Sequence, residues 1–579
     1  MKGIFKMLNH EILEKYNLWC EKAVDDPALV TELKGVASDE DGVFDRFYTE
    51  LKFGTAGLRG VIGAGTNRMN IYTVGRVTKG LADCINSKRS GGSVAISYDP
   101  RINSELFAKH AARVLAANGI KVYITPVLEP TPVLSFMVRY YGCDAGIMIT
   151  ASHNPAQYNG YKCYGPDGCQ MTDVYADETT AFVNKVDYFG VEVADFDEGV
   201  KSGVIEYTDD AMLDNYYKKV LERAIDPEIC EKSGLSVLYT PLNGTGNIPV
   251  REILARMKVK CEVVHEQEMP DGNFPTTPYP NPEFPKAFEI GIEMAKTTAP
   301  DIILATDPDA DRAGVAVRDK DGQYKLLTGN EIGCMMTYYI LSRKSEMGKL
   351  PANSMVVKSL VTSDLASKIA EKYSCRMVNV LTGFKYIGEQ IKLLEEKGNE
   401  ELFQLGFEES YGYLSGSYVR DKDAVFAAMM ISEMAAYCKL SGKTLLDFMQ
   451  EIYSEFGVFR HKTISASFDG EQGMNTMAGI MKSLRENAPE KVAGLEVVSV
   501  ADHLERKILD KKTGAVSAID LPPADVFVMN LENDCSLIIR PSGTEPKIKA
   551  YLTACAKTLE QADAIVAQIE KTANEIFDK

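Results

Sequence analysis

The chain lacks any long apolar run. No stretch approaches the ~20 consecutive apolar residues that a bilayer-spanning helix needs. Its first six residues lead into polar, helix-like sequence instead of the apolar core of a signal peptide. These two absences predict a cytoplasmic protein with no membrane partner.

Positive charge is in short supply as well. The chain carries 64 Lys and Arg against 82 Asp and Glu, which gives a net charge of −18. Binding to nucleic acid needs a basic face, so a nucleic-acid partner is not expected. A small anionic ligand is still possible, because a few convergent cations and backbone N–H groups suffice for it whatever the total charge.

Paired cysteine motifs are also missing. The twelve cysteines are scattered without any C-x-x-C, and the closest pair is Cys163 and Cys169. This spacing predicts reduced and mostly buried thiols instead of zinc ligands or disulfides.

At 579 residues the chain is too long for one hydrophobic core, and its 45% hydrophobic and 25% charged content is that of an ordinary globular protein. Short β-branched runs alternate with longer helical patterns, which predicts α/β layers. The expected strands are 94–98, 236–239, 302–305 and 355–357, and the expected helices include 106–117 and 330–342.

The C-terminal part has a different pattern. Residues 536–540 read as a strand followed by a tight turn, and the alternation of Ile548, Ala550 and Leu552 predicts a returning strand with one buried face. A helix with one apolar stripe is expected over 559–577. We therefore expect an α+β module with antiparallel strands, and domains at 1–205, 206–325, 326–455 and 456–579.

Residues 150–155, Thr-Ala-Ser-His-Asn-Pro, follow an expected buried strand at 145–149. Ligands in α/β proteins bind beyond the carboxyl ends of the strands. By itself the stretch fits a Ser/Asn turn as well as it fits a nucleophile. Adjacent side chains of an extended chain point apart, so Ser152 and His153 are not expected to form part of a Ser-His-Asp triad.

Three carboxylates at alternating positions, Asp307, Asp309 and Asp311, follow the expected strand at 302–305. They would repel one another without a cation, and Mg²⁺ is the hard, oxygen-binding ion that suits them. An EF-hand is excluded because arginines stand at positions 6 and 12 of that loop. The phosphatase signature D-x-D-x-T is a nearer rival, and a solvated acidic turn is the plain alternative. A phosphate on Ser152 would give such a metal a further anionic ligand.

Two further stretches contain polar side chains that could bind a ligand, the first an anion and the second a pair of hydroxyl groups. Residues 540–547, Arg-Pro-Ser-Gly-Thr-Glu-Pro-Lys, combine a guanidinium with the hydroxyls and backbone N–H groups of a tight turn, which favours anion binding over a simple hairpin. In the stretch 406–412, Gly-Phe-Glu-Glu-Ser-Tyr-Gly, Glu408 and Ser410 would face the same way if the backbone is extended, which would suit two adjacent sugar hydroxyls. Taken alone, this stretch fits an ordinary loop or strand edge better. Arg59 falls in a glycine-dense loop. Lys162 and Lys422 could each be merely solvated.

These stretches, in this order, resemble the α-D-phosphohexomutase superfamily, the phosphoglucomutases and phosphomannomutases. The resemblance covers essentially the whole chain and is closest to the branch with glucose-type phosphoglucomutases and phosphopentomutases. It implies four domains around a central cleft, three related α/β domains and a C-terminal α+β domain. The implied activity is the reversible movement of phosphate between C1 and C6 of an aldohexose, through a phosphoserine and glucose 1,6-bisphosphate.

The resemblance also implies roles for residues. Ser152 would carry the phosphate, and one Mg²⁺ would be held by Asp307, Asp309, Asp311 and a phosphoserine oxygen. The further catalytic residues would be His153, Lys162, Lys422 and Arg59, with Lys422 as the base and Lys162 as electrostatic support. The substrate-binding residues would be Thr382, Gly383, Glu408, Ser410, Arg312, Arg540, Ser542, Gly543, Thr544 and Lys547.

Departures from the family pattern concern the sugar. Glu409 and Tyr411 replace parts of the Glu-Met-Ser-Gly-His loop of phosphomannomutase-type enzymes, which favours glucose over mannose. Phe384 stands where glucose enzymes frequently have Trp, which leaves room for a pentose. The alternatives are a phosphopentomutase, a phosphomannomutase or a glucose-1,6-bisphosphate synthase, and, from other classes, a Mg²⁺-dependent sugar phosphatase or a non-catalytic sugar-phosphate binder.

Overall fold

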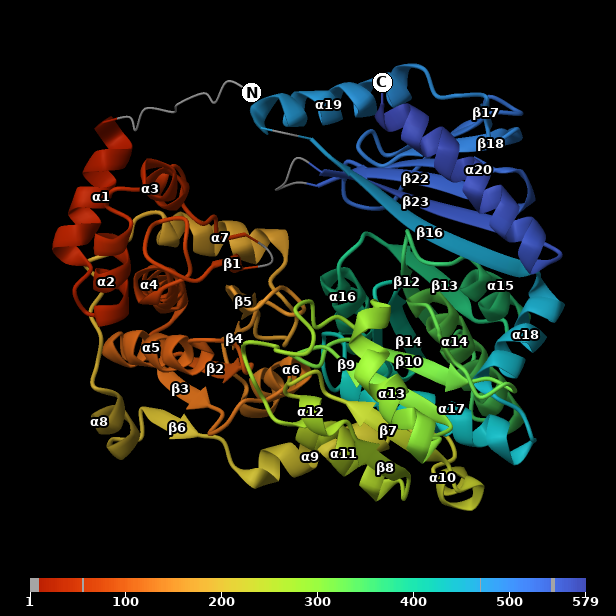
Figure 1. Cartoon of the computed structure of the whole chain (residues 1–579), viewed down its shortest axis with the longest axis horizontal. Helices are drawn as coiled ribbons and strands as arrows, with labels where there is room; N and C mark the ends of the chain where they lie inside the picture. The colour runs from red at the N-terminus through yellow and green to blue at the C-terminus, as the bar shows by residue number, and fades with distance from the viewer. Residues whose placement is uncertain (1–9, 55–56, 469, 543–546, 579) are drawn as a thin grey trace. The chain divides into compact units, whose positions relative to one another are not determined.

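The computed structural model describes residues 10–54, 57–468, 470–542 and 547–578. The chain forms two compact units. The first unit comprises residues 1–327, 387–401 and 411–442, and the second comprises residues 328–386, 402–410 and 443–579. Figure 1 shows the elements of both units, coloured from red at the N-terminus to blue at the C-terminus.

The first sheet of the first unit has the strand order β1-β5-β4-β2-β3-β6. Its strands are β1 (Leu58–Val61), β2 (Ser93–Tyr98), β3 (Lys121–Ile124), β4 (Ala145–Ile149), β5 (Tyr158–Tyr164) and β6 (Ile205–Tyr207). β2, β3, β4 and β6 run parallel, whereas β5 is antiparallel to both β4 and β1. β4 is buried along its whole length, as expected for a strand that is covered on both faces.

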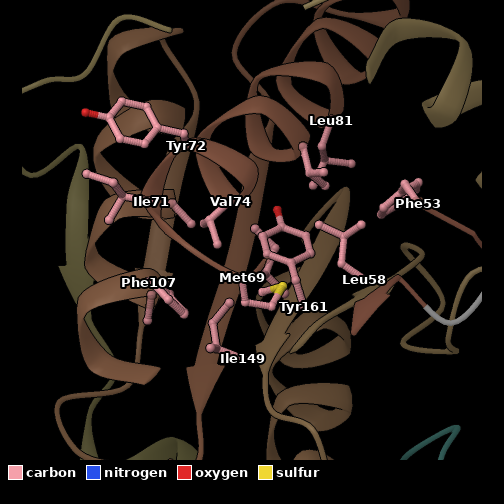
Figure 2. Packing of buried hydrophobic residues seen from close by; sticks show 14 of the residues in the cluster. Phe53, Leu58, Met69, Ile71, Tyr72, Val74, Leu81, Phe107, Ile149 and Tyr161 are labelled. Carbon is pink, nitrogen blue, oxygen red and sulfur yellow. The ribbon is translucent and has the colours of Figure 1, made fainter. Parts of the chain in front are cut away.

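Helices surround this sheet. They are α1 (His10–Lys22), α2 (Pro27–Gly35), α3 (Glu40–Phe47), α4 (Ile71–Lys88), α5 (Ser104–Ala117), α6 (Thr131–Tyr141), α7 (Asp173–Val183), α8 (Phe196–Lys201) and α9 (Asp210–Leu221). A capping box formed by Asn70 and Thr73 fixes the start of α4. Figure 2 shows the core that α4 and β4 share, in which Met69, Ile149 and Tyr161 are completely buried. This packing anchors the end of β4, one residue before Thr150.

The second sheet of the first unit has the order β11-β10-β9-β7-β8. Its strands are β7 (Ser236–Thr240), β8 (Lys260–Val263), β9 (Ile302–Thr306), β10 (Ala313–Arg318) and β11 (Tyr324–Leu326). β7, β8 and β9 are parallel, and β10 turns back against β9 so that the loop 307–312 joins the two. The other elements of this unit are α10 (Glu228–Ser233), α11 (Asn247–Arg256), α12 (His265–Glu268), η1 (Pro285–Phe288), α13 (Glu289–Thr298), most of α16 (Phe384–Glu395), β15 (Gly412–Leu414) and α17 (Ala424–Leu440).

The second unit begins with a parallel arrangement. β12 (Met355–Ser359) pairs on one side with β13 (Arg376–Val380) and on the other with β14 (Phe403–Glu408). The accompanying helices are α14 (Gly329–Glu346), α15 (Leu365–Lys372) and α18 (Leu445–Phe456). The short η2 (Glu400–Leu402), which begins in the first unit, leads into β14. The strands of this sheet are again followed by loops at their carboxyl ends, where α/β proteins bind ligands.

The C-terminal part of the second unit is an antiparallel sheet of order β16-β23-β22-β21-β18-β19-β20. Its elements are β16 (Val458–Ser467), α19 (Gly470–Glu486), β17 (Lys491–Val492), β18 (Leu495–Asp502), β19 (Lys507–Asp510), β20 (Val516–Ala518), β21 (Phe527–Leu531), η3 (Glu532–Asp534), β22 (Ser536–Pro541), β23 (Lys547–Ala556) and α20 (Leu559–Phe577). α20 buries one stripe that includes Val566, Ile569 and Ala573. In Figure 1 this helix crosses the strands of its own sheet.

The elements agree closely with the sequence patterns. The expected strands correspond to β2, β7, β9 and β12, and the expected helices to α5 and α14. The C-terminal hairpin and helix are β22, β23 and α20, and β23 buries Ile548, Ala550 and Leu552 as the alternation predicted. The predicted fold class, α/β domains followed by an α+β domain, is confirmed. The four domain boundaries remain a prediction.

None of the twelve cysteines, all of which are described, takes part in a disulfide, and most of them are buried. Among the described residues, no single helix combines the length and apolar character of a membrane span, although α17 and α18 taken together as a bent pair meet the same criteria of length and composition.

Candidate functional site

Ser152 lies on a left-handed stretch of backbone just beyond β4. Its φ is 53°, and its N–H donates to Thr150 Oγ1 at 2.8 Å. Ser152 Oγ lies 3.1 Å from His153 Nδ1. The expectation that these two side chains point apart is therefore wrong, because the backbone at Ser152 is not extended. Burial, together with the nearby charges of Arg312 and Arg59, holds the pKa of His153 well below its ordinary value, so the imidazole is neutral at neutral pH.

The acidic loop folds back on itself after β9. Asp307 Oδ1 accepts the backbone N–H groups of Asp311 at 3.1 Å and Arg312 at 3.0 Å, which closes the loop and turns the three carboxylates toward one another. One oxygen from each of Asp307, Asp309 and Asp311 lies within 4.8 Å of the others, and all three residues are buried. Ser152 Oγ donates to Asp307 Oδ2 at 3.1 Å. Two predicted stretches, 155 residues apart, thus meet at one point.

Two lysines offset the charge of these carboxylates. Lys162 extends from β5, and its Nζ lies 2.7 Å from Asp309 Oδ2 and 3.3 Å from Asp311 Oδ2. Lys422 Nζ lies 3.1 Å from Asp311 Oδ2 and 3.0 Å from Asp421 Oδ1. Both ammonium groups are largely buried, so their attraction to the carboxylates is only weakly screened by solvent.

The donor set fits a hard divalent cation. Burial, and then the neighbouring Asp309 and Asp311, raise the pKa of Asp307 well above its ordinary value, because its charged form loses solvation and is repelled by those two carboxylates. Asp309 Oδ1 and Asp311 Oδ1 are buried without a hydrogen-bond partner in the described part of the chain. Buried carboxylate oxygens that lack a donor are suitable ligands for such an ion. The structure therefore supports a metal-binding group at this loop.

Two arginines lie near the loop. Arg59 is in β1 and not in the loop that was expected, since β1 pairs with β5 and sets Arg59 opposite Gly160. Its Nη1 donates to Asn154 Oδ1 at 3.3 Å. Arg312 Nη1 donates to Glu283 Oε1. The first unit therefore gathers the predicted catalytic residues, the metal ligands and Arg312 in one cluster.

The predicted sugar-binding residues lie in the second unit. β14 ends at Glu408, whose Oε1 accepts the Gly383 N–H at 2.8 Å. The neighbouring Thr382 Oγ1 is buried with no hydrogen-bond partner among the residues that the structure describes. Ser410 lies in the turn after β14, so an extended backbone does not align it with Glu408 as expected.

The phosphate loop lies in the hairpin between β22 and β23. The Ser542 N–H donates to Lys547 O at 2.7 Å, which holds the two strand ends together below the turn. Gly543 and Thr544 fall outside the described residues. Burial raises the pKa of Tyr551 to about 12, Glu409 and Glu408 act in the same direction, and Arg540 opposes them. Tyr551 of β23 thus lies close to Glu408 and Glu409 as well as to Arg540.

Three residues of the first unit belong to this site although their sequence context did not single them out. Thr131, at the start of α6, is completely buried and donates from Oγ1 to Asp309 Oδ2 at 2.8 Å. Asp421 accepts from Lys422, and Tyr164 donates to its other oxygen at 2.7 Å. Glu283 accepts from Arg312. Of these three residues, only Asp421 could have been suggested by the sequence, because it is adjacent to Lys422. Thr131 and Glu283 contact segments that are distant in the sequence, so no local pattern points to them.

The buried strands, with polar loops and a buried group of carboxylates beyond their carboxyl ends, define an α/β protein with a candidate active site. Sequence profiles of "Phosphoglucomutase/phosphomannomutase, alpha/beta/alpha" domains match three segments of the chain: domain I at residues 50–188, domain II at 214–322 and domain III at 328–456. The chain belongs to the phosphoglucomutase/phosphomannomutase family, within the α-D-phosphohexomutase superfamily that its motifs indicated.

Curated relatives are similar over nearly the full length. A phosphoglucomutase of Staphylococcus haemolyticus (strain JCSC1435) is 37% identical over 517 residues, which cover 89% of this chain and 92% of the relative. A phosphoglucomutase of Staphylococcus aureus (strain MSSA476) is 35% identical over 574 residues, which cover 98% of this chain and 100% of the relative.

Solved structures share the fold. The open form of the Paramecium exocytosis-sensitive phosphoprotein pp63/parafusin, a phosphoglucomutase, superposes with a TM-score of 0.69 at 18% identity and covers 92% of this chain and 96% of its own. A phosphoglucomutase/phosphomannomutase family protein from Burkholderia thailandensis gives a TM-score of 0.64 at 18% identity and covers 90% of this chain and 96% of its own. At these identities the two structures support the fold alone.

Proposed function

We propose that the protein is a phosphoglucomutase. It interconverts glucose 1-phosphate and glucose 6-phosphate through a phosphoserine at Ser152 and glucose 1,6-bisphosphate. The observation that carries the proposal is the placement of Ser152 Oγ, 3.1 Å from Asp307 in a buried carboxylate triad flanked by Lys162 and Lys422. The names of the curated relatives support glucose phosphates as the substrates.

In the forward half-reaction a sugar hydroxyl attacks the phosphorus of phosphorylated Ser152. The new bond joins phosphorus to the sugar oxygen, and the bond between phosphorus and Ser152 Oγ breaks in line with it. The bisphosphate then presents its other phosphate to Ser152, and the same steps run in reverse. A covalent phosphoenzyme divides one difficult transfer into two easier ones.

The proton movements are assigned to residues that touch the reacting atoms. Lys422 is the proposed base: once its ammonium group has given up a proton, the neutral amine accepts the proton of the attacking hydroxyl. Lys162 serves as a fixed positive charge. His153 Nδ1, 3.1 Å from Ser152 Oγ, is placed to exchange a proton with that hydroxyl when the serine carries no phosphate. Arg59 and Arg312 offset the charge of the transferring group.

The cofactor proposed is Mg²⁺, one per active site, held by Asp307, Asp309, Asp311 and an oxygen of phosphorylated Ser152. When bound it supplies positive charge next to the transferring phosphoryl group. Glucose 1,6-bisphosphate is the proposed activator, because it restores the phosphate whenever Ser152 has lost it. The proposed partners are therefore small sugar phosphates.

The second unit supplies the proposed recognition of the sugar and of its distal phosphate. Glu408 and Ser410, with Thr382 and Gly383, hold sugar hydroxyls. The residues of the hairpin turn hold the distal phosphate: Arg540, Ser542, Gly543, Thr544 and Lys547. Phe384, the first residue of α16, is smaller than tryptophan. Ribose 1-phosphate is therefore the competing substrate, and a phosphopentomutase is the second candidate.

Intact-mass measurement combined with a coupled assay tests the proposal. The wild type is expected to carry a phosphate-sized increment and to form glucose 6-phosphate from glucose 1-phosphate with catalytic bisphosphate. Ser152→Ala should lose the increment and at least about 10³-fold of the activity. The matched control is Ser432→Ala, which removes a buried hydroxyl that only donates to Ala428 O within α17, and it should keep both.

Other outcomes contradict the proposal. A wild-type enzyme that forms no glucose 6-phosphate is not a phosphoglucomutase. Stoichiometric release of inorganic phosphate without any need for bisphosphate indicates a Mg²⁺-dependent sugar phosphatase. Faster turnover of ribose 1-phosphate than of glucose 1-phosphate indicates a phosphopentomutase. Binding of sugar phosphate without any turnover indicates a non-catalytic binder.

A further inference from the structure

The guanidinium group of Arg101 binds the backbone of the segment 152–158, called the serine loop below. Arg101 follows β2, is almost completely buried, and points its terminal nitrogens into the segment 152–158. Its Nη2 donates to the carbonyl oxygens of Ser152 and Asn154. Its Nη1 donates to Pro155 O at 2.9 Å and to Tyr158 O at 3.0 Å. Four backbone carbonyls of the loop are therefore tied to one side chain.

Arg101 is itself held by an acid from its own segment. Its Nε lies 3.2 Å from Asp99 Oδ2, and both side chains are completely buried. Asp99 Oδ1 accepts the Arg101 N–H at 2.9 Å and the Ser104 hydroxyl at 2.8 Å, so the carboxylate cannot turn away from the guanidinium. Nε and Oδ2 make no hydrogen bond with each other, but solvent hardly screens the attraction between the two buried charges.

Arg101 also packs against a part of the first unit that is distant in the sequence. The guanidinium carbon lies 5.0 Å from the ring centroid of Phe274, a distance at which cations and aromatic rings attract. Gly272 allows this approach, because a Cβ there would lie 2.6 Å from both Ile102 N and Pro100 O. The turn 271–274 lies within the matched domain II, whereas Arg101 and the serine loop lie within domain I.

The backbone of Ser152, which Arg101 contacts, does not adopt a relaxed conformation. Its φ of 53° is in the region that side-chain-bearing residues rarely enter. Such strain persists only where the surroundings enforce it, and it is concentrated at functional sites. Arg101 binds the carbonyl of Ser152 itself and three carbonyls after it, which opposes relaxation of the loop.

We propose that Arg101, kept in place by Asp99 and by the Gly272–Phe274 turn, is a positioning residue that aims Ser152 Oγ for phosphoryl transfer. The inference rests on the proposed function, since the transfer it affects is the one proposed for Ser152. Phosphoryl transfer in domain I then depends on a turn of domain II that contacts neither the serine nor the carboxylates.

The test separates kcat from KM in four variants. Arg101→Lys keeps the positive charge but cannot bind four carbonyls, and Phe274→Leu keeps apolar bulk without a ring. A misplacement of about 1 Å costs up to about 10²-fold in rate, so we expect kcat to fall about 10- to 100-fold in Arg101→Lys and several-fold in Phe274→Leu. KM for glucose 1-phosphate should stay within about threefold, because neither side chain binds the sugar. Phe274→Tyr should restore the wild-type kcat, and Arg113→Lys, a control on α5 whose Nε binds Ala194 O, should not change it.

The outcomes separate the two proposals. A wild-type enzyme without mutase activity overturns the proposed function and this inference with it. An active wild type, with kcat of Arg101→Lys within twofold of it, overturns the inference alone, and so does a rise in KM at constant kcat. Should Arg101→Lys fail to give the wild-type near-ultraviolet circular dichroism, the Phe274 pair decides. Equal kcat in Phe274→Leu and Phe274→Tyr then contradicts the inference, and a lower kcat in Phe274→Leu alone supports it.

Discussion

Thr131 gives the sharpest test of how the metal-binding group is built. Its hydroxyl donates to Asp309 Oδ2 at 2.8 Å, while Lys162 approaches the same oxygen at 2.7 Å. Thr131→Val keeps the shape of the side chain and removes only that donor. The residue is completely buried, so water cannot replace the lost hydrogen bond. The Thr131 N–H still donates to Asp309 O at 2.9 Å, so the start of α6 should keep its place.

The magnitude follows from the charge of the acceptor. A hydrogen bond to a charged group contributes about 1.5–3 kcal/mol, so the free energy of unfolding of the metal-free protein should fall by that amount. Asp309 also loses the contact that fixes its orientation. Partners of this kind typically change metal affinity by about 10- to 100-fold, and the Mg²⁺ concentration that gives half-maximal activity should rise by that factor.

Two measurements and one control complete the experiment. Urea unfolding of the chelator-treated protein reports stability, and a Mg²⁺ titration of the mutase rate reports affinity. The control Thr337→Val removes an equally buried hydroxyl that donates to Gly333 O at 2.7 Å within α14, so it should cost about 1 kcal/mol and leave the Mg²⁺ dependence unchanged. The reasoning is refuted if both variants reach half-maximal activity at Mg²⁺ concentrations within twofold of each other.

Three further predictions concern other parts of the chain. Removal of divalent ions with a chelator should abolish turnover and lower the melting temperature, because the buried carboxylates of Asp307, Asp309 and Asp311 then repel one another. Added Mg²⁺ should reverse both effects. An unchanged melting temperature would contradict a metal ion at these carboxylates. Burial raises the pKa of Glu129 from 4.5 to about 8, so its folded form binds the proton more tightly than the unfolded chain does. The contribution of Glu129 to the free energy of unfolding should be complete below pH 4.5 and be lost at about 1.4 kcal/mol per pH unit as the pH rises toward 8. Glu129→Gln should flatten this slope when urea unfolding is measured at pH 5 to 8. Parallel profiles of the variant and the wild type would contradict the prediction. Glu408→Gln should raise KM for glucose 1-phosphate about tenfold, because a charged acceptor of sugar hydroxyls is lost. The control Glu371→Gln, at an exposed position of α15, should not change KM. Equal KM values for the two variants would mean that Glu408 does not bind the sugar.

Sequence patterns were sufficient wherever burial alone decides the structure. The run 302–305 reads as a strand because each of its residues is apolar, and β9 is buried throughout. The stripe over 559–577 reads as a helix because one face of it must be covered, and α20 covers that face. The four motifs likewise indicated the superfamily, through the residues that they contain and their order along the chain.

Patterns failed where a single backbone angle or a distant partner decides. The side chains of Ser152 and His153 lie within hydrogen-bond distance because φ of Ser152 is 53°. A serine in the sequence does not predict such a backbone angle. Arg59 belongs to a strand because β5 pairs with its segment, although its glycines suggested a loop. Ser410 does not align with Glu408 because β14 ends at Glu408, two residues before Ser410.

The sequence by itself determined the chemistry of this protein, a serine with three alternating carboxylates and the basic residues for a phosphosugar. These follow from residue type and order, which need no fold to be read. Only the tertiary structure decided that Ser152 Oγ contacts Asp307, that Thr131 and Lys162 share one oxygen of Asp309, and that Arg101 ties the serine loop to Phe274. Those contacts join segments up to 178 residues apart, which come together only in the folded chain.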